Sequence, residues 1–227
     1  SVILRNDGAE AKKLSIFSYN EWVSGIRKEK HARFITQEYS KKKKALFAQN
    51  LYNNEFAERV AFTSLFQKHS EHSPLFYTTD RLEFIGRNNS LSCPVAVCEG
   101  KTLDNKVYVG NDPCAAFQTD FWLEPGEQKE FQVLLGEAES RSKADQIISA
   151  YANPEKSSQA FQSIQKLWKN KLSKIQVETP EESFNIMMNG WLLYQTIACR
   201  MWARTGYYQA GGAFGFRDQL QDSLAAM

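Results

Sequence analysis

The hydrophobic pattern of this chain changes once, near Ser140, and that change limits the folds it can adopt. Before it, apolar and polar residues alternate in short runs separated by turn-forming residues, which is typical of β-strands. After it, apolar residues recur three and four positions apart, which is typical of α-helices. The order of the two patterns predicts a β domain followed by helices.

The clearest pair of predicted strands lies on either side of Pro125-Gly126, a strong turn signal. Residues 115–123 are mostly apolar on one face, and the alternation resumes in residues 131–135. Many strands of this kind favour an antiparallel β-sandwich, and the alternative is an α+β domain with a single sheet. A further turn is predicted at Asn6-Asp7-Gly8. The other predicted strands lie at 2–5, 14–23, 33–39, 45–52, 60–66, 82–85 and 106–109.

Helices are predicted after the change. Ser140 can cap a helix that runs to Tyr151, and Asn153-Pro154 ends it. A second helix, 157–172, places several apolar residues on one stripe: Phe161, Ile164, Leu167 and Trp168.

A third helix follows Thr179-Pro180 and ends near Gly206. Because it is apolar over much of its circumference, we expect it to be deeply buried. Its apolar positions include Phe184, Met187, Trp191, Tyr194, Ala198 and Met201.

The predicted fold class is therefore α+β with more than one domain. Residues 1–139 form the β-sandwich domain, residues 140–178 form a helical linker, and residues 179–227 open an all-helical domain. The chain starts without a methionine inside a predicted strand and stops inside a predicted helix. We therefore expect it to be part of a larger protein, with both end domains incomplete.

Composition argues against several classes of function. A net charge of +2 gives no reason to expect nucleic acid or an anionic membrane as partner, and no apolar run approaches the roughly 20 residues that cross a bilayer. The four cysteines form neither a CxxC pair nor a dense disulfide framework, which favours a reducing, cytoplasmic compartment. His69 and His72 have no further ligands to complete a zinc site, so we expect no metal.

The residues most suggestive of a ligand lie in the segment WLLYQTIACRMWARTGYYQAGGAFGFRDQLQD, residues 191–222. Aromatic faces stack on sugar rings, and planar charged or amide groups bind paired hydroxyls, so we expect a polyhydroxylated ligand. On a helix Arg217 faces Gln221, four residues away. Asp218 faces Asp222 in the same way. The loop before this helix offers further candidates: Tyr207, Tyr208 and Gln209.

Each of these features also has a structural explanation. The two aspartates could each pair with a cation from elsewhere, as a structural ion-pair network. Trp191, Tyr194 and Trp202 fall on or near the apolar stripe, which favours a place in the core. The glycine-rich stretch 211–215 lacks the spacing of a phosphate-binding loop, and no G-x-S-x-G supports nucleophilic hydrolysis.

The chain also resembles a known family. The segment 191–222 resembles the start of the catalytic barrel of glycoside hydrolase family 94, formerly glycosyltransferase family 36. FIGRNNSLSCPVAV, GNDPCAAFQTDFWLEPGEQKEFQVLLGEA and Thr179-Pro180 resemble the same family in the same order. Within the family, the chain most resembles the phosphorylase-like C-terminal region of cyclic β-1,2-glucan synthases and related bacterial phosphorylases. The resemblance implies an N-terminal β-sandwich, a helical linker and the first helices of an (α/α)6 barrel.

The resemblance further implies an activity. Members of the family are typically inverting phosphorylases, in which phosphate attacks the anomeric carbon of a β-glucoside and one carboxylic acid protonates the leaving oxygen. Inorganic phosphate is then a co-substrate, and no cofactor is expected. The family's acid lies further along the barrel, in a Trp-Asn-Asp-type segment that is not found here. We therefore expect no catalytic residue and no phosphorolysis in this chain alone.

The resemblance assigns substrate-binding roles within the last segment. Those at the subsite of the transferred glucosyl unit are Arg217, Asp218, Asp222 and, more weakly, Gln221. Those along the approach are Tyr207, Tyr208 and Gln209.

The expected substrate is a β-1,2-glucan oligosaccharide, cleaved with phosphate to give α-glucose 1-phosphate. One alternative is a disaccharide phosphorylase for cellobiose, laminaribiose or diacetylchitobiose, and another is a non-catalytic glucan-binding or scaffold module. The parent protein could also be a membrane-embedded synthase. An apolar face on helix 216–227 would be exposed without barrel partners, so we expect poor solubility or a homodimer.

Overall fold

The computed structural model describes residues 1–25, 27–53, 56–68, 74–110, 112–198, 220, 221 and 224. The chain divides into two compact units, residues 1–157 and 158–227. Helices α1 (Lys28–His31) and η1 (Ala32–Phe34) belong to the first unit. Its strands are β1 (Val2–Arg5), β2 (Lys12–Glu21), β3 (Ile35–Ser40), β4 (Ala45–Asn50), β5 (Val60–Gln67), β6 (Phe76–Asp80), β7 (Pro113–Leu123) and β8 (Gln128–Ala138).

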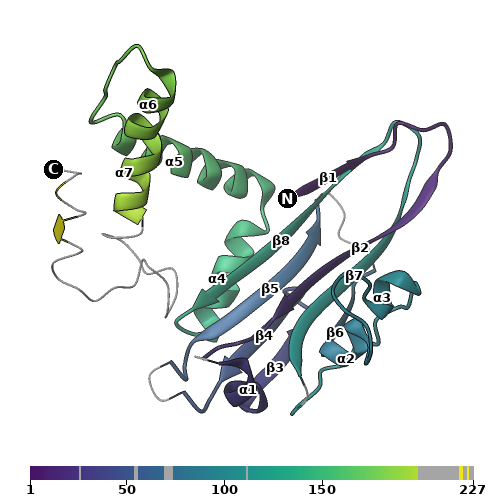
Figure 1. Ribbon diagram of the computed structural model, residues 1–227. Coiled ribbons are helices and arrows are strands. Elements are labelled where there is room, and N and C mark those ends of the chain that lie inside the picture. Colours follow the sequence, from purple (N-terminus) through teal and green to yellow (C-terminus); the bar gives the residue numbers. More distant parts are fainter. Residues whose placement is uncertain are drawn as a thin grey trace. The chain divides into compact units, whose positions relative to one another are not determined.

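These strands form two antiparallel sheets (Figure 1). The large sheet has the order β1-β8-β5-β4-β3, and the small sheet has the order β2-β7-β6. Fully buried side chains such as Phe117 of β7 and Phe131 of β8 fill the space between them. The predicted antiparallel β-sandwich is therefore confirmed, and the single-sheet alternative is wrong.

Helices cover part of the outer face of each sheet. Because successive side chains of a strand point to opposite faces, each sheet has a second apolar face to bury. On the large sheet, Phe47 and Phe62 pack against Ala144 and Ile148 of α4 (Arg141–Tyr151). On the small sheet, Ala116 packs among residues of α2 (Arg81–Ile85) and α3 (Val95–Cys98). The first unit thus has four layers, helix, sheet, sheet and helix.

The run predicted as the clearest strand pair is divided between the two sheets. β7 pairs with β2 and β6, whereas β8 pairs with β1 and β5, so Pro125-Gly126 lies in a connection between sheets and not in a hairpin. The connection between β1 and β2 also passes from one sheet to the other, at the same end of the sandwich. Asn6 links these two connections: its N–H donates to the Glu127 carbonyl over 3.0 Å, and its carbonyl accepts from Gly126 N–H over 2.8 Å. Together, β1–β2 and β7–β8 form one antiparallel ribbon that bends from one sheet into the other.

Two predicted strands are absent from the described residues. Residues 82–85 form most of α2, because the Asp80 carboxylate caps the helix by accepting from Leu82 N–H over 3.1 Å. Gly86 ends the helix with φ +91°, a conformation that favours glycine. Residues 106–109 contribute only an isolated bridge between Lys106 and Thr78.

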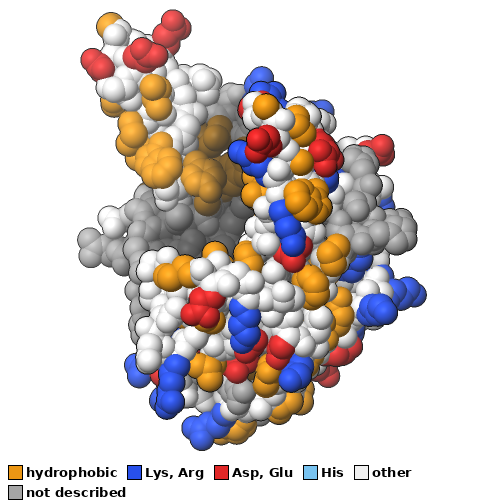
Figure 2. Space-filling view, turned by 90° about the vertical axis from the view of Figure 1, so that its right-hand side faces the viewer, with side chains coloured by type: hydrophobic (Ala, Val, Ile, Leu, Met, Phe, Trp, Pro, Cys, Tyr) orange, Lys and Arg blue, Asp and Glu red, His pale blue; other side chains and the backbone are white. Residues whose placement is uncertain are grey.

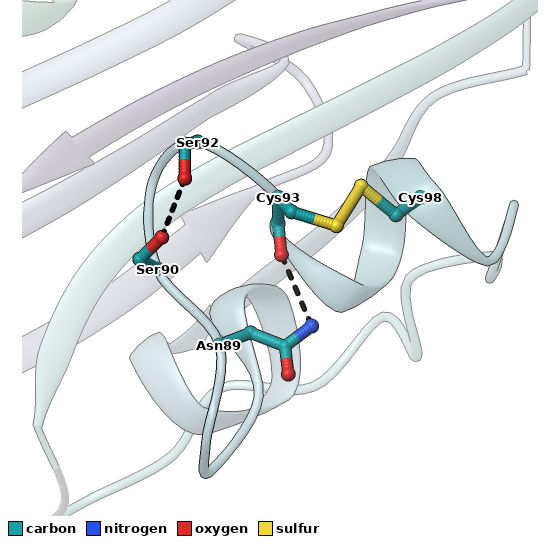
Figure 3. Close-up of a disulfide and its surroundings, with 5 residues drawn as sticks. All are labelled: Asn89, Ser90, Ser92, Cys93 and Cys98. Atoms are coloured by element: carbon teal, nitrogen blue, oxygen red, sulfur yellow. Dashed lines mark hydrogen bonds between the residues drawn. A yellow bond between two sulfur atoms is a disulfide. The ribbon is translucent and has the colours of Figure 1, made fainter.

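A disulfide closes the loop that contains α3. Cys93 and Cys98, with Cα atoms 5.8 Å apart, are bonded to one another, and Asn89 Nδ2 donates to the Cys93 carbonyl over 3.0 Å (Figure 3). The cysteine spacing gave no reason to pair these residues, and their disulfide removes the argument from the cysteines for a reducing compartment. Both cysteines are exposed, whereas Ala96 between them is fully buried against the small sheet. Cys114 is a free, buried cysteine.

The helices after the sandwich follow the predicted order with altered bounds. The Ser140 hydroxyl caps α4 by accepting from Lys143 N–H over 3.3 Å, which confirms the predicted start. α5 (Pro154–Leu172) begins earlier than predicted, because proline is tolerated in the first helical turn and Asn153 Oδ1 accepts from Glu155 N–H over 2.8 Å. The third predicted helix is described as α6 (Glu182–Ile186), the π-helical η2 (Met187–Trp191) and α7 (Leu192–Gln195).

Candidate functional site

The residues predicted to bind substrate lie mostly outside the described residues. Gln221 is described: it is helical and exposed. The others and Trp202 lie outside the described residues, and their roles stay predictions. Outside the described residues are Tyr207, Tyr208, Gln209, Arg217, Asp218 and Asp222.

Two asparagines fix the start of the helix that leads towards this segment. Asn185 Oδ1 accepts from Thr179 N–H over 2.9 Å, and its Nδ2 donates to the Thr179 carbonyl over 2.9 Å. Asn189 makes the same pair of bonds to Val177, over 2.7 and 2.8 Å. The four helical residues from Asn185 to Asn189 rise about 6.0 Å. The two extended residues from Val177 to Thr179 span about 6.6 Å, so each asparagine lies beside its partner. The extended chain is thus held along one side of the helix.

The apolar surface of this helix is not buried as predicted. Trp191 is 55% exposed, Tyr194 is 38% exposed, and only Leu193 falls in the buried class among its described residues. The Trp168 ring of α5 lies 4.6 Å from the Tyr194 ring and covers one side. An all-round apolar helix needs neighbours on every side, and the described residues of this unit supply too few. The core interpretation of Trp191 and Tyr194 is therefore wrong for this chain.

Several large apolar side chains of this helix are exposed, and together we call them the α6–α7 surface. In Figure 2, hydrophobic side chains gather in the upper part of the view, at the height of α6 and α7 in Figure 1. An exposed patch of large apolar side chains is typical of an interaction surface. Its members are Phe184, Ile186, Met187, Trp191, Leu192 and Tyr194.

A group of charged residues lies at one end of the small sheet. Glu21 is at its centre, because its carboxylate accepts from Lys28 Nζ over 2.5 Å and from Arg81 Nε over 3.1 Å. Lys28 also bonds to Asp112 over 2.8 Å, and the Tyr19 hydroxyl donates to Glu21 over 2.7 Å. Each carboxylate thus has a cation partner.

The surroundings of Glu21 and Tyr19 shift the pKa of both side chains. Burial opposes ionisation of Glu21, but hydrogen bonds from Lys28, Tyr19 and Arg81 outweigh it and lower the pKa of the carboxyl. Burial and the hydrogen bond to Glu21 raise the pKa of Tyr19. A general acid or base needs a pKa near the working pH, so these shifts favour a structural role.

A hollow of about 340 Å³ lies on the outer face of the large sheet, at β3 and β4. The Arg141 guanidinium stands 3.6 Å from the centroid of the Phe47 ring and pairs with Glu38 over 2.5 Å. The aromatic face is therefore covered by a cation, and it offers no free platform for a sugar ring.

Among the described residues, His, Cys, Asp and Glu side chains nowhere gather in threes that could hold a metal ion. Every described helix is too short or too polar to span a lipid bilayer.

Comparison with known proteins gives the family. Residues 1–154 match the family model described as glycosyl hydrolase 94, supersandwich domain. Residues 167–227 match the model described as glycosyl hydrolase 94 superfamily, catalytic domain. The chain belongs to glycosyl hydrolase family 94.

Curated relatives extend the comparison. Cyclic β-(1,2)-glucan synthase NdvB of Rhizobium meliloti is 36% identical over 222 residues, which cover 98% of this chain and 8% of that protein. N,N'-diacetylchitobiose phosphorylase of Vibrio furnissii is 26% identical over 99% of this chain and 28% of its own length. Solabiose phosphorylase of Paenibacillus borealis is 24% identical over 99% of this chain and 28% of its own length. The chain thus spans less than a third of the length of each of these relatives.

Proposed function

We propose that the protein carrying this chain is an inverting glycoside phosphorylase that acts on β-1,2-linked glucan. The observation that carries the proposal is the 36% identity, along 98% of the chain, to a protein named as a β-(1,2)-glucan synthase. Relatives named as phosphorylases match the same length at lower identity, which supports the reaction class. The proposed partners are therefore a β-glucan oligosaccharide and inorganic phosphate, without a further cofactor.

The proposed reaction needs one protein acid. A phosphate oxygen attacks the anomeric carbon from the face opposite the leaving sugar, the glycosidic C–O bond breaks, and a carboxylic acid protonates the leaving oxygen. The β-linkage is thereby converted to α-glucose 1-phosphate. We assign the acid to a Trp-Asn-Asp-type segment that is not found in this sequence, so the 227-residue chain by itself is proposed to be inactive.

The donor subsite is assigned to the last segment of the chain. A guanidinium and carboxylates make directional, charge-assisted hydrogen bonds to paired sugar hydroxyls. Arg217, Asp218 and Asp222 are proposed to bind the transferred glucosyl unit, and Gln221 is proposed to assist them. Tyr207, Tyr208 and Gln209 are proposed to line the approach.

The test is release of α-glucose 1-phosphate from β-1,2-glucooligosaccharides by a protein that contains this chain and the complete catalytic domain. Arg217→Ala and Asp222→Ala should each lower kcat/KM at least about a hundredfold, which corresponds to about 2.7 kcal/mol of transition-state stabilisation. Ser142→Ala, an exposed position remote in sequence from the assigned subsite, provides a control. Folded variants with unchanged activity would overturn the subsite assignment.

The same assay separates the alternatives. Turnover of diacetylchitobiose, cellobiose or laminaribiose without turnover of β-1,2-glucan would identify a disaccharide phosphorylase, for which the diacetylchitobiose phosphorylase relative is the supporting observation. Glucan binding without sugar phosphate would identify a binding or scaffold module. A cytoplasmic location and a homodimer complete the proposal, and they are tested by cell fractionation and by sedimentation.

A further inference from the structure

The outer face of the small sheet is only partly covered. Near one end, α2, α3 and Leu103 cover the outward side chains Phe17, Tyr19, Phe76 and Ala116. Towards the other end β6 stops, and the β2–β7 pair continues beyond the helices (Figure 1). The outward side chains on this part form what we call the Trp122 face: Lys13, Ser15, Asp120 and Trp122.

The strand register brings these side chains together. Lys13 lies opposite Trp122, and Ser15 lies opposite Asp120. Directly opposite residues of an antiparallel pair have Cβ atoms about 5 Å apart, and successive outward residues on one strand are about 7 Å apart. A ligand no larger than a disaccharide can therefore contact all of them at once.

The carboxylate of this face is held in a fixed position. Ser15 Oγ donates to Asp120 Oδ1 over 2.7 Å, and Gln118 Nε2 donates to the same oxygen over 3.1 Å. Gln118 is 3% exposed and is itself fixed, because its Oε1 accepts from Leu103 N–H over 3.0 Å. The second oxygen, Asp120 Oδ2, has no hydrogen-bond partner among the described residues. The sheet thus presents one oriented acceptor.

An aromatic surface stands beside this acceptor. Trp122 is 56% exposed, although it belongs to a regular strand whose inward neighbours Phe121 and Leu123 are buried. A single exposed apolar side chain is common and identifies no site by itself. Here, however, a rigid indole lies next to a preorganised carboxylate and opposite a lysine, and that combination offers both stacking and hydrogen bonding.

We propose that the Trp122 face is a non-catalytic binding subsite for a β-linked glucan chain. A pyranose ring stacks on the indole of Trp122, its hydroxyls donate to Asp120 Oδ2, and Lys13 Nζ donates to a further sugar oxygen. The formal charges of Lys13 and Asp120 cancel, so the face favours a neutral polyhydroxylated ligand over an anion or an acidic peptide. The choice of polysaccharide rests on the proposed function.

The test is calorimetric titration of the 227-residue chain with a β-1,2-linked glucopentaose, with maltopentaose as the α-linked comparison. Trp122→Ala should weaken binding at least about tenfold, because it removes the stacking surface. Asp120→Asn should weaken binding at least about threefold, because the amide keeps Oδ1 for Ser15 and Gln118 and replaces the free acceptor with a donor. Both positions are on the surface, and thermal unfolding verifies that the variants fold.

The control is Tyr52→Ala, which removes another exposed aromatic side chain, 63% exposed, from the turn after β4. Its binding should equal that of the unaltered chain. Wild-type affinity in Trp122→Ala would overturn the proposal, as would equal affinity for maltopentaose or the absence of any glucan binding. Loss of binding only in Arg217→Ala would place the sugar at the proposed donor subsite instead. Phosphorolysis by the longer protein is measured separately, so failure of one proposal does not imply failure of the other.

Discussion

At the scale of single residues, Asn6 shows how one buried amide maintains the junction of two sheets. It is 3% exposed, and its Nδ2 donates to the carbonyls of Glu10 and Leu123 over 2.8 and 2.9 Å. Its Oδ1 accepts from Gly8 N–H over 3.0 Å. An alanine there would leave these backbone groups without their partners, and buried unpaired groups are costly.

We therefore expect Asn6→Ala to lower the free energy of unfolding by about 2–3 kcal/mol, measured by urea denaturation. Asp7→Ala is the matched control, since the Asp7 side chain is 72% exposed and pairs only with exposed Arg5 in the described residues. It should change stability by less than about 0.5 kcal/mol. Equal effects of the two substitutions would refute this account of Asn6.

Glu21 leads to a prediction about pH. Burial opposes ionisation of this carboxyl, but hydrogen bonds from Lys28, Tyr19 and Arg81 hold its folded-state pKa below the ordinary value for glutamate. A lowered folded-state pKa means that the carboxylate stabilises the fold above the unfolded-state pKa, and that this stabilisation is lost as the pH falls through the folded-state pKa. The relevant window therefore lies below about pH 4.5.

Glu21→Gln should lower the free energy of unfolding at pH 7 by about 1 kcal/mol, a value limited by solvent screening of a partly exposed group. The difference from the unaltered chain should shrink as the pH falls below that window. Urea denaturation at pH 7 and pH 3.5 measures both effects, with the exposed Glu29→Gln as control. A difference that is the same at both pH values would contradict the prediction.

At the scale of elements, the start of α4 depends on Ser140. Ser140→Ala should destabilise the first unit by about 1 kcal/mol, because the hydroxyl that accepts from Lys143 N–H is lost. Ser142→Ala, an exposed position in the first turn, should be nearly neutral. Thermal unfolding of the two variants makes the comparison, and a larger loss in Ser142→Ala would show that capping does not stabilise α4.

Strands could be predicted from the sequence more readily than their partners. Period-2 alternation marks β7 and β8, but Pro125-Gly126 suits both a hairpin and a crossing between sheets, and only long-range pairing decides between them. The short apolar run at 82–85 was equally ambiguous, and the Asp80 cap determined the helix. Burial of the third helix was mispredicted because periodicity reports a surface to be covered, not what covers it.

The two candidate sites differ in whether a local sequence motif identifies their residues. The donor-subsite residues were predicted from the family motif, and those around Arg217 fall outside the described residues, so they remain predictions. The Trp122 face was missed, although a signal was present: Trp122 occupies a position in β7 where alternation predicts a polar residue, after Gln118 and Asp120. Its cross-strand neighbours come from β2, more than a hundred residues earlier, and the register alone reveals them.

At the scale of the whole chain, the exposed α6–α7 surface predicts self-association. Large apolar side chains on one helix, such as Ile186 at 64% exposure, lower their free energy by leaving water. We expect sedimentation velocity to show a concentration-dependent rise in mass, and Ile186→Lys to reduce it. The control is Leu91→Lys, an equally exposed residue of the first unit, at 64%. A chain that stays monomeric at high concentration would exclude this role of the surface.

The bent ribbon delays strand pairing while the protein is being synthesised. Lys12 pairs with Leu123, so 111 residues (123 minus 12) separate the partners, and β1 must likewise wait for β8. At synthesis rates of about 5–20 residues per second, the N-terminal strands remain unpaired for roughly 6–20 s. The small sheet cannot close before residue 123 has been made, because β7 joins β2 to β6, and the large sheet cannot close before residue 138, because β8 joins β1 to β5. The nascent sandwich therefore depends on its last strand, and a chain stalled before β8 exposes two strand edges to chaperones or to aggregation.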